Sequence, residues 1–408
     1  MPALKIFEKY IPFALPFLLF FFRGLADLTV VVVGIFFLYK SFKESKWSWA
    51  KELWFKYSVV FVLYLTTINV YISIDPGDTL FYAVTFIRWP VFAAAIYFWI
   101  FKEVHALKKF LLTLSFLLPF LIFDIWLQFL TGEDIFGYSK YGYDRLTGPL
   151  RNNPVIGIFM LKYLFIYLLS TIVFKNLSKD SKKLLFISSL VLIGFTTIFI
   201  TGERMSLILF TSSSLFLLII ICFQNKRGWL YTFLISLFML VIIYFFQITY
   251  PDVFSRAIES SFYKLKNLFE SDYGMVYQTA IKTWQENPVF GGGLHQFKNL
   301  YPFYNIDIWK NTAINHAHNY PLSLLAETGI VGLILFYIII LNLCKRVFNS
   351  LSFHKNILNF FIIINLLYIC FFPFMTHYSF QHNWMNATNW LIVGLVLAAS
   401  KKNYAKLK

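Results

Sequence analysis

The sequence predicts an all-α integral membrane protein with about twelve transmembrane helices and a helical loop between the ninth and the tenth. Three observations lead to this fold class. Hydrophobic residues make up 59% of the 408-residue chain, above the ~45–50% typical of soluble domains. Uncharged stretches long enough to cross ~30 Å of hydrocarbon recur along the whole chain. One long polar connection interrupts them.

The apolar stretches lie near residues 8–22, 25–40, 54–73, 79–101, 110–130, 154–174, 184–202, 205–223, 229–248, 322–343, 356–376 and 384–400. The first two are short and nearly continuous. We therefore divide the chain into residues 1–248 with spans one to nine, residues 249–321 as a loop on one side of the membrane, and residues 322–408 with spans ten to twelve and a tail.

Lysine and arginine alternate between the connections in step with this count. They gather in residues 40–56, 102–109, 175–183, 226–227, 345–355 and 401–408, whereas residues 72–78 and 376–383 contain none. The positive-inside rule then places both termini in the cytoplasm and the odd-numbered connections outside. Most of the net charge of +16 is thereby explained by topology. It attracts anionic membrane lipids and is no argument for binding nucleic acid.

The long loop is expected to form a helical lid over the outer side. In residues 252–270 large apolar side chains recur at three- and four-residue spacing, at Phe254, Ile258, Phe262, Leu265 and Phe269. Such a stripe is typical of an amphipathic helix in the membrane interface. Residues 275–286 form a second helical run, and Gly291–Gly293 follow as a flexible turn.

Five of the seven histidines fall on the outer side of this topology: His295, His316, His318, His377 and His382. A neutral imidazole can accept a proton from an attacking hydroxyl, which makes a general base the favoured interpretation. Histidines that only cap and hydrogen-bond are one alternative. A metal site is another, but His316 and His318 are two residues apart on an extended segment and should point to opposite faces. No outward thiolate or carboxylate cluster completes a ligand set, so we expect no metal and no cofactor.

Arginines supply candidate anion ligands on the same side. Arg204 lies in a minimal turn between two long apolar spans, where a guanidinium can chelate a phosphate or act as a snorkelling anchor paired with Glu203. Arg256 on the lid is a second candidate for the same anion. Arg145 and Arg151 form a third basic group, suited to phosphate or glycan.

Three charged residues fall within predicted spans: Arg88, Asp124 and Glu327. Charges at membrane depth are functional candidates because burying them costs ~3 kcal/mol or more unless they are paired. A purely structural Arg88–Asp124 ion pair explains two of the three equally well. We otherwise expect Arg88 and Glu327, with His316 and Asn319, to position substrates.

Four motifs together resemble those of the bacterial O-antigen ligase and O-antigen polymerase superfamily. They are Arg-Leu-Thr-Gly at 145–148, Thr-Gly-Glu-Arg at 201–204, Asn-Pro-Val-Phe-Gly-Gly-Gly at 287–293, and His318-Asn319 followed after nine residues by Gly-Ile-Val-Gly at 329–332, overlapping Leu-Ala-Glu-Thr-Gly at 325–329. Twelve spans with one large loop before the tenth also fit. The chain departs from the pattern at Met275, where the family has an arginine.

The resemblance implies a GT-C-like membrane glycosyltransferase of the bacterial inner membrane with a periplasmic site. Such an enzyme moves a glycan from undecaprenyl diphosphate to an acceptor hydroxyl, with inversion and without a metal. His318 would activate the acceptor hydroxyl and Arg204 would bind the donor diphosphate, with Arg256, Arg145 and Arg151 as further diphosphate ligands.

Four functions remain to be separated, of which a related protein glycosyltransferase is one of the less favoured. The favoured one is O-antigen ligase, whose acceptor is the lipid A–core oligosaccharide. The second is O-antigen polymerase, which joins one lipid-linked repeat to another. A transporter or flippase of lipid-linked sugars belongs to a different class. It is disfavoured by the structured lid, by the absence of a visible inverted repeat, and by histidines gathered at one mouth.

Overall fold

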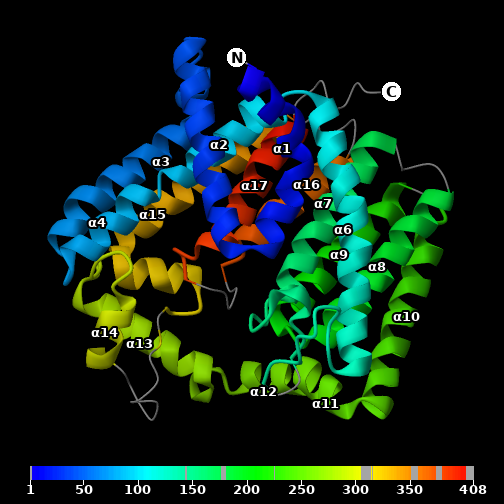
Figure 1. Ribbon diagram of the computed structural model, residues 1–408. Coiled ribbons are helices and arrows are strands. Elements are labelled where there is room, and N and C mark those ends of the chain that lie inside the picture. The colour runs from blue at the N-terminus through cyan, green and yellow to red at the C-terminus, as the bar shows by residue number, and fades with distance from the viewer. Residues whose placement is uncertain are drawn as a thin grey trace.

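The computed structural model describes residues 2–142, 145–175, 181–224, 226–304, 314, 316–350, 357–373 and 379–400. Within these residues the regular structure is helical, apart from two isolated bridges, Glu133 with Ser139 and Tyr141 with Arg145. The predicted all-α class is confirmed for this part of the chain (Figure 1).

The first half of the chain forms helices throughout. Its elements are α1 Pro2–Phe21, α2 Arg23–Lys43, η1 Ser48–Lys51, α3 Leu53–Tyr64, η2 Leu65–Asn69, α4 Pro76–Thr85, α5 Arg88–Ala95, η3 Ile96–Ile100, α6 Val104–Thr131, η4 Gly148–Leu150, α7 Ile156–Lys175 and α8 Ser181–Thr201. The second half contains α9 Arg204–Gln224, α10 Gly228–Thr249, α11 Pro251–Phe254, η5 Ser255–Glu259, α12 Ser260–Lys266, η6 Leu268–Glu270, α13 Asp272–Glu286, α14 Phe297–Tyr304, α15 Tyr320–Ser350, α16 Ile357–Phe371 and α17 Asn383–Ala399.

Seven of the described helices are long and apolar enough to cross a membrane: Arg23–Lys43, Pro76–Ile100, Val104–Thr131, Leu184–Thr201, Arg204–Gln224, Gly228–Thr249 and Tyr320–Ser350. Three shorter helices are also apolar: Leu53–Asn69, Ile156–Leu169 and Phe360–Phe371. Each apolar stretch found in the sequence coincides with a helix or a run of helices. The count of twelve spans and the GT-C-like arrangement stay predictions.

The core is built around α17. This helix is buried on every side from Trp384 to Ala399 and packs against α2, α5 and α16. A helix that is apolar all round is expected at the centre of a bundle. By contrast, α10 buries only 17% of its most apolar window, so it forms the edge of the bundle and offers its side chains to lipid.

The loop helices lie across one end of the bundle. In Figure 1, α1 begins and α17 ends at the top, whereas α11, α12, α13 and α14 cross the bottom. The predicted amphipathic segment 252–270 is helical over most of its length, and α14 is a helix that the sequence analysis missed.

A break in α15 fixes the end of the bundle next to these loop helices. Gly329 has φ 62° and ψ −171°, a conformation that only glycine adopts readily. The carbonyl groups freed by the break are bonded again by the glycine turn. Gly292 N donates to Ala326 O at 3.0 Å and Gly293 N to Glu327 O at 2.9 Å. Irregular backbone at membrane depth is stable when protein groups satisfy it in this way.

Two side chains of the third apolar stretch complete this docking. The Tyr64 hydroxyl donates to Thr328 O at 2.7 Å, and Asn69 Nδ2 donates to Glu327 O at 2.9 Å. A Cβ atom on Gly291 would overlap the backbone at 327–329. The glycine turn and the Leu-Ala-Glu-Thr-Gly segment are therefore the two halves of one close backbone contact.

Candidate functional site

A cavity of about 550 Å³ opens on the side of the loop helices. Five segments that are far apart in the sequence line it. Its lining residues are Arg145, Pro154, Val155, Gly202, Glu203, Arg204, Met205, Ser206, Arg256, Ser260, Lys264, Asp272, Tyr273, His316 and His318. The structure thus brings together five residues selected from the sequence: Arg145, Arg204, Arg256, His316 and His318. We call this space the arginine–histidine cavity.

Arg204 begins α9 and reaches toward the lid. Its Nη1 donates to the hydroxyl of Ser260 on α12 at 2.7 Å. Glu203 is not its partner: the carboxylate accepts from Gly157 N at 2.6 Å and from Ile158 N at 3.1 Å, at the start of α7. The alternative of a snorkelling Arg204–Glu203 pair is therefore wrong, since a buried carboxylate takes the unpaired N–H groups of a helix N-terminus instead.

Burial raises the pKa of the Glu203 carboxyl, while its hydrogen-bond donors act in the opposite direction. With Glu203 occupied at α7, the guanidinium of Arg204 makes no ion pair to any residue that the structure describes. It is held by one neutral hydroxyl and remains able to bind an anion.

The lid contributes one polar helix face. Arg256, Ser260 and Lys264 follow one another at four-residue spacing and all line the cavity, as residues on one face of a helix do. Gly202 has φ +70°, and a Cβ there would overlap the Arg256 side chain. Glycine at this position lets the Arg256 side chain lie directly across the 201–204 turn.

The balance of charge in the cavity is positive. Four cationic side chains line it, namely Arg145, Arg204, Arg256 and Lys264, against the carboxylates of Glu203 and Asp272. Asp272 is bonded to Lys264 at 3.1 Å, and Arg145 donates to Pro154 O at 3.0 Å. Fixed cations in a partly enclosed space attract a multiply charged anion more strongly than they would in water.

The two histidines lie side by side, contrary to the sequence analysis. The rings of His316 and His318 have centroids 4.0 Å apart. His318 adopts the left-handed conformation with φ 50°, so the segment turns and does not run extended. The ring of His318 also contacts Tyr273 edge to face at 5.6 Å. A non-glycine residue in this conformation is strained and is often found in binding or catalytic sites.

Asn319 and Glu327 lie outside the cavity lining and support it. Asn319 caps α15 by accepting from Leu322 N at 3.0 Å, and its side chain is also hydrogen-bonded to Tyr277 on α13. Glu327 is 2% exposed and accepts from Gln381 Nε2 at 2.8 Å. Both side chains bond to the protein and so help to hold the cavity in place; the predicted part of Asn319 and Glu327 in positioning substrate stays a prediction.

Arg151 and Arg88 are also outside this cavity. Arg151 is exposed, and its Nε donates to the Tyr138 hydroxyl at 2.8 Å. Arg88 forms an ion pair with Asp27 at 3.2 Å. The predicted Arg88–Asp124 pair is wrong, because Asp124 accepts from the backbone N–H of Ile135 at 2.8 Å instead.

The sequence analysis missed several residues of the site. Lys264 and Ser260 had a usable signal in their four-residue spacing from Arg256. Tyr64 and Asn69, which hold the glycine turn, had none, because they belong to an apolar span and act on backbone atoms more than 200 positions away.

His377, one of the five histidines expected on the outer side, lies outside the described residues. Among the residues that the structure does describe, no three His, Cys, Asp or Glu side chains are grouped closely enough to hold a metal ion. The metal-independent mechanism stays a prediction.

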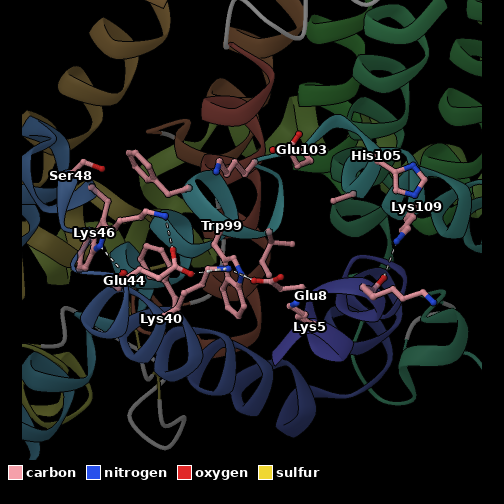
Figure 2. Close-up of a pocket in the computed structure, with 18 residues that line it drawn as sticks. Lys5, Glu8, Lys40, Glu44, Lys46, Ser48, Trp99, Glu103, His105 and Lys109 are labelled. Carbon is pink, nitrogen blue, oxygen red and sulfur yellow. Dashed lines mark hydrogen bonds and ion pairs between the residues drawn. The ribbon is translucent and has the colours of Figure 1, made fainter. Parts of the chain in front are cut away.

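Another cavity, of about 940 Å³, lies elsewhere, where α1 and α6 begin and α2 ends. Lysines dominate its lining, and Figure 2 shows Lys40 beside Glu8 and Lys46 beside Glu44. Trp99 Nε1 also donates to Glu8. These lysines belong to the connections that the positive-inside rule assigns to the cytoplasm, so this cavity is suited to anionic lipid headgroups.

Comparison with known families gives a match to part of the chain. The family described as O-Antigen ligase matches residues 189–337. This range runs from α8 into α15 and includes the 201–204 turn, the lid, the glycine turn and both cavity histidines. Over these residues the chain is similar to the O-antigen ligase family. A search of curated proteins found no match.

The match agrees with the apolar helices of the chain, seven of which, among those that the structure describes, are long enough to cross a membrane. Most of the arginine–histidine cavity lies inside the matched range. Arg145, Pro154 and Val155 are its lining residues outside that range.

Proposed function

We propose that this protein is an O-antigen ligase. It transfers a glycan from undecaprenyl diphosphate to a sugar hydroxyl of lipid A–core at the periplasmic face of the bacterial inner membrane, with inversion and without a metal. The observation that carries the proposal is the cavity in which Arg204, Arg256, Arg145 and Lys264 converge beside His316 and His318.

The cations suit the leaving group of this reaction. When the glycosyl–diphosphate bond breaks, negative charge develops on the diphosphate, and fixed guanidinium groups stabilise that charge without reorganising. Arg204 comes from the start of α9 and Arg256 from the lid, and both line the cavity. The diphosphate is held between them, and closing of the lid excludes water from it.

The histidines suit the nucleophile. A neutral imidazole within hydrogen-bond reach of the acceptor hydroxyl takes its proton as the hydroxyl attacks the anomeric carbon from the face opposite the diphosphate. We assign this role to His318, and the adjoining ring of His316 helps to position the hydroxyl. The lipid tails of both substrates lie among the apolar helices next to the cavity.

The test uses purified protein in detergent with undecaprenyl-diphosphate-linked glycan and lipid A–core, with EDTA present and no nucleotide. Glycan attached to lipid A–core establishes the ligase. Longer undecaprenyl-linked chains with unmodified lipid A–core identify a polymerase, which the family match also allows. If folded protein gives neither product but moves the lipid-linked glycan across vesicle membranes, the protein is a transporter.

A further inference from the structure

A second cavity, of about 440 Å³, shares no lining residue with the arginine–histidine cavity. Its residues come from the start of α2, from α4, from the loop after the glycine turn and from the segment that enters α17. They are Arg23, Gly24, Asp27, Tyr82, His295, Ser379, Gln381, His382, Asn383 and Trp384. Its volume is within the ~300–1,000 Å³ range of small-molecule sites.

A carboxylate orients one histidine of this cavity. His295 Nδ1 lies 2.8 Å from Asp78 Oδ2, and Lys298 Nζ and Gln296 Nε2 also contact that oxygen, at 3.3 and 3.0 Å. An ionised aspartate only accepts hydrogen bonds, so the contact requires a proton on Nδ1 and leaves Nε2 as an acceptor.

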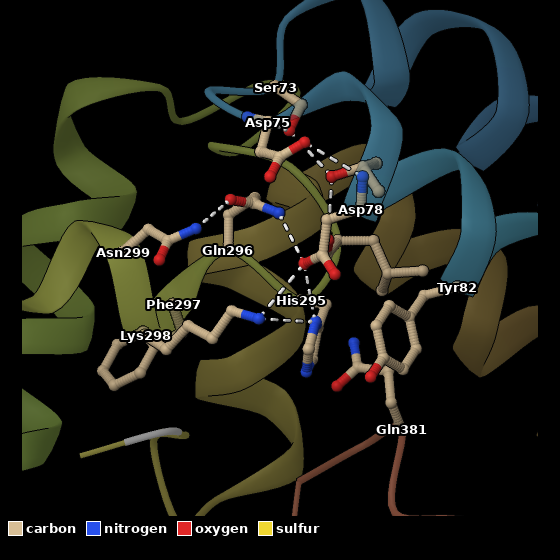
Figure 3. Close-up of polar contacts among 12 residues, drawn as sticks. Ser73, Asp75, Asp78, Tyr82, His295, Gln296, Phe297, Lys298, Asn299 and Gln381 are labelled. Carbon is tan, nitrogen blue, oxygen red and sulfur yellow. Dashed lines mark hydrogen bonds and ion pairs between the residues drawn. The ribbon is translucent and has the colours of Figure 1, made fainter. Parts of the chain in front are cut away.

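The second nitrogen of His295 is available to a ligand. In Figure 3 it points away from Asp78, and the ring lies against Tyr82, with ring centroids 3.7 Å apart. Nε2 makes no hydrogen bond to any residue in the described part of the chain. Burial lowers the pKa of His295, which keeps the ring neutral and Nε2 able to accept at neutral pH.

The other lining groups match the surface of a sugar. Tyr82 supplies a half-buried aromatic ring for the apolar C–H face of a pyranose, and the planar ends of Arg23, Asp27 and Asn383 can each pair with neighbouring hydroxyls. Arg23 lies 5.3 Å from the Trp384 ring.

The charge of this cavity also suits a sugar. Its lining contains one arginine, Arg23, and one carboxylate, Asp27, which is held by an ion pair with Arg88, so the cations do not converge here as they do in the arginine–histidine cavity. A neutral polyol fits this balance, whereas a diphosphate fits the basic cavity described above.

The two cavities are neighbours. Arg23, which lines the second cavity, donates to Asn153. The next two residues, Pro154 and Val155, line the arginine–histidine cavity. The two cavities are therefore separated by only a few residues near Asn153. A glycan that reacts in one cavity can place another of its sugars in the second.

We propose that the second cavity is a saccharide-binding subsite, in which His295 Nε2 accepts a hydrogen bond from a sugar hydroxyl and Asp78 positions the ring. The sugar belongs to one of the two glycans that meet in the reaction. This inference rests on the proposed function, and it assigns a role to His295 that the chemistry at His318 does not use.

The experiment compares wild type with His295→Phe, which keeps the ring packing against Tyr82 but removes both nitrogens. Tyr82→Leu, which removes the aromatic ring offered to the sugar, is a second variant in case the first is unstable. Asn299→Ala is the matched control, since Asn299 bonds to Gln296 and does not line the cavity. Losing one hydrogen bond to a sugar predicts about a five- to tenfold rise in KM for one glycan, with kcat unchanged.

The KM values for the two substrates show which glycan supplies the sugar. A rise for lipid A–core assigns the subsite to the acceptor, and a rise for the undecaprenyl-linked substrate assigns it to the donor glycan. Asp78→Asn, which frees the His295 tautomer, should produce the same rise in KM without a change in kcat.

Binding of lipid-free oligosaccharide, released by mild acid from lipid A–core or from the donor, is measured in parallel by calorimetry. If wild type transfers no glycan at all, the proposed function fails, yet weaker oligosaccharide binding by His295→Phe still supports the subsite. If both variants keep wild-type KM values and bind both oligosaccharides as wild type does, the subsite is refuted.

Discussion

Replacing Arg204 by alanine separates a catalytic from a structural role for this residue. Within the described protein the Arg204 guanidinium makes one hydrogen bond, to the hydroxyl of Ser260 at 2.7 Å. If its purpose is to hold the lid, removing either partner loses the same bond. If its purpose is to bind the diphosphate, only the loss of Arg204 removes the charge that the transition state needs.

The two roles predict effects of different size. A hydrogen bond to a charged group contributes about 1.5 kcal/mol, which corresponds to roughly a tenfold change in rate. Losing one fixed donor to a developing anion costs about 10²–10³ in rate. We therefore expect Arg204→Ala to reduce kcat/KM by 10²–10³ and Ser260→Ala by about tenfold or less. Arg204→Lys should lie between them, because it keeps the charge and loses bidentate geometry.

The assay measures initial rates of glycan transfer to lipid A–core at varied donor concentration, with folding checked by thermal unfolding. Arg151→Ala is the matched control: it is an exposed arginine bonded to Tyr138, outside the cavity, and should transfer at the wild-type rate. Equal losses in Arg204→Ala and Ser260→Ala would refute the diphosphate role and leave Arg204 as a lid contact.

Three further predictions concern His318, Gly329 and His382. His318→Ala should lower kcat by about 10²–10⁴, whereas His105→Ala, in the lysine-lined cavity, should leave transfer unchanged; wild-type transfer by the first variant would exclude His318 as the base. Gly329→Ala should destabilise the fold by about 3 kcal/mol or more, because φ is +62° and the new Cβ would overlap Val289 O. Thermal unfolding measures this loss, and Gly142→Ala, at a position with open space around it, is the control. Burial lowers the pKa of His382 to about 4, below its unfolded ~6.5, so stability should be lost as pH falls from about 6.5 toward 4, and His382→Asn should flatten that dependence in thermal unfolding.

Much of the fold followed from local composition. A span is recognised from its own apolar residues, and the lid helix from its phenylalanine stripe, since neither needs knowledge of a distant partner. The same holds for the polar face of the lid, where Arg256 and Lys264 share a side of one helix. These features are encoded over ten to twenty residues, and the structure contains a helix at each place.

The partners of the charged residues within the spans could not be predicted from the sequence. Arg88 and Asp124 looked like partners because each was an isolated charge in neighbouring spans, yet Arg88 pairs with Asp27 and Asp124 accepts from a backbone amide. Which carboxylate meets an arginine depends on how the helices rotate about their axes. Composition does not determine that rotation; packing does.

The histidine pair shows the same limit at the scale of one turn. An extended segment would separate His316 from His318, but the left-handed backbone at His318 brings the rings together. Nothing in the local sequence demands that conformation. It is imposed where the segment meets α13, through Tyr273 against the His318 ring and Tyr277 bonded to Asn319.

The motifs therefore divide by what their side chains touch. Arg204 and His318 line the arginine–histidine cavity, whereas Gly291 and Gly329 lie against backbone and allow two segments to meet. The glycines affect the position of the cavity residues because the histidine segment leads directly into the start of α15. A side chain added at Gly329 would separate the glycine turn from α15 and move His318 relative to Arg204, which sits on a different helix. A glycine substitution that leaves the protein folded should thus lower kcat more than it raises the KM for the donor, since it misplaces the base while the arginines stay in position.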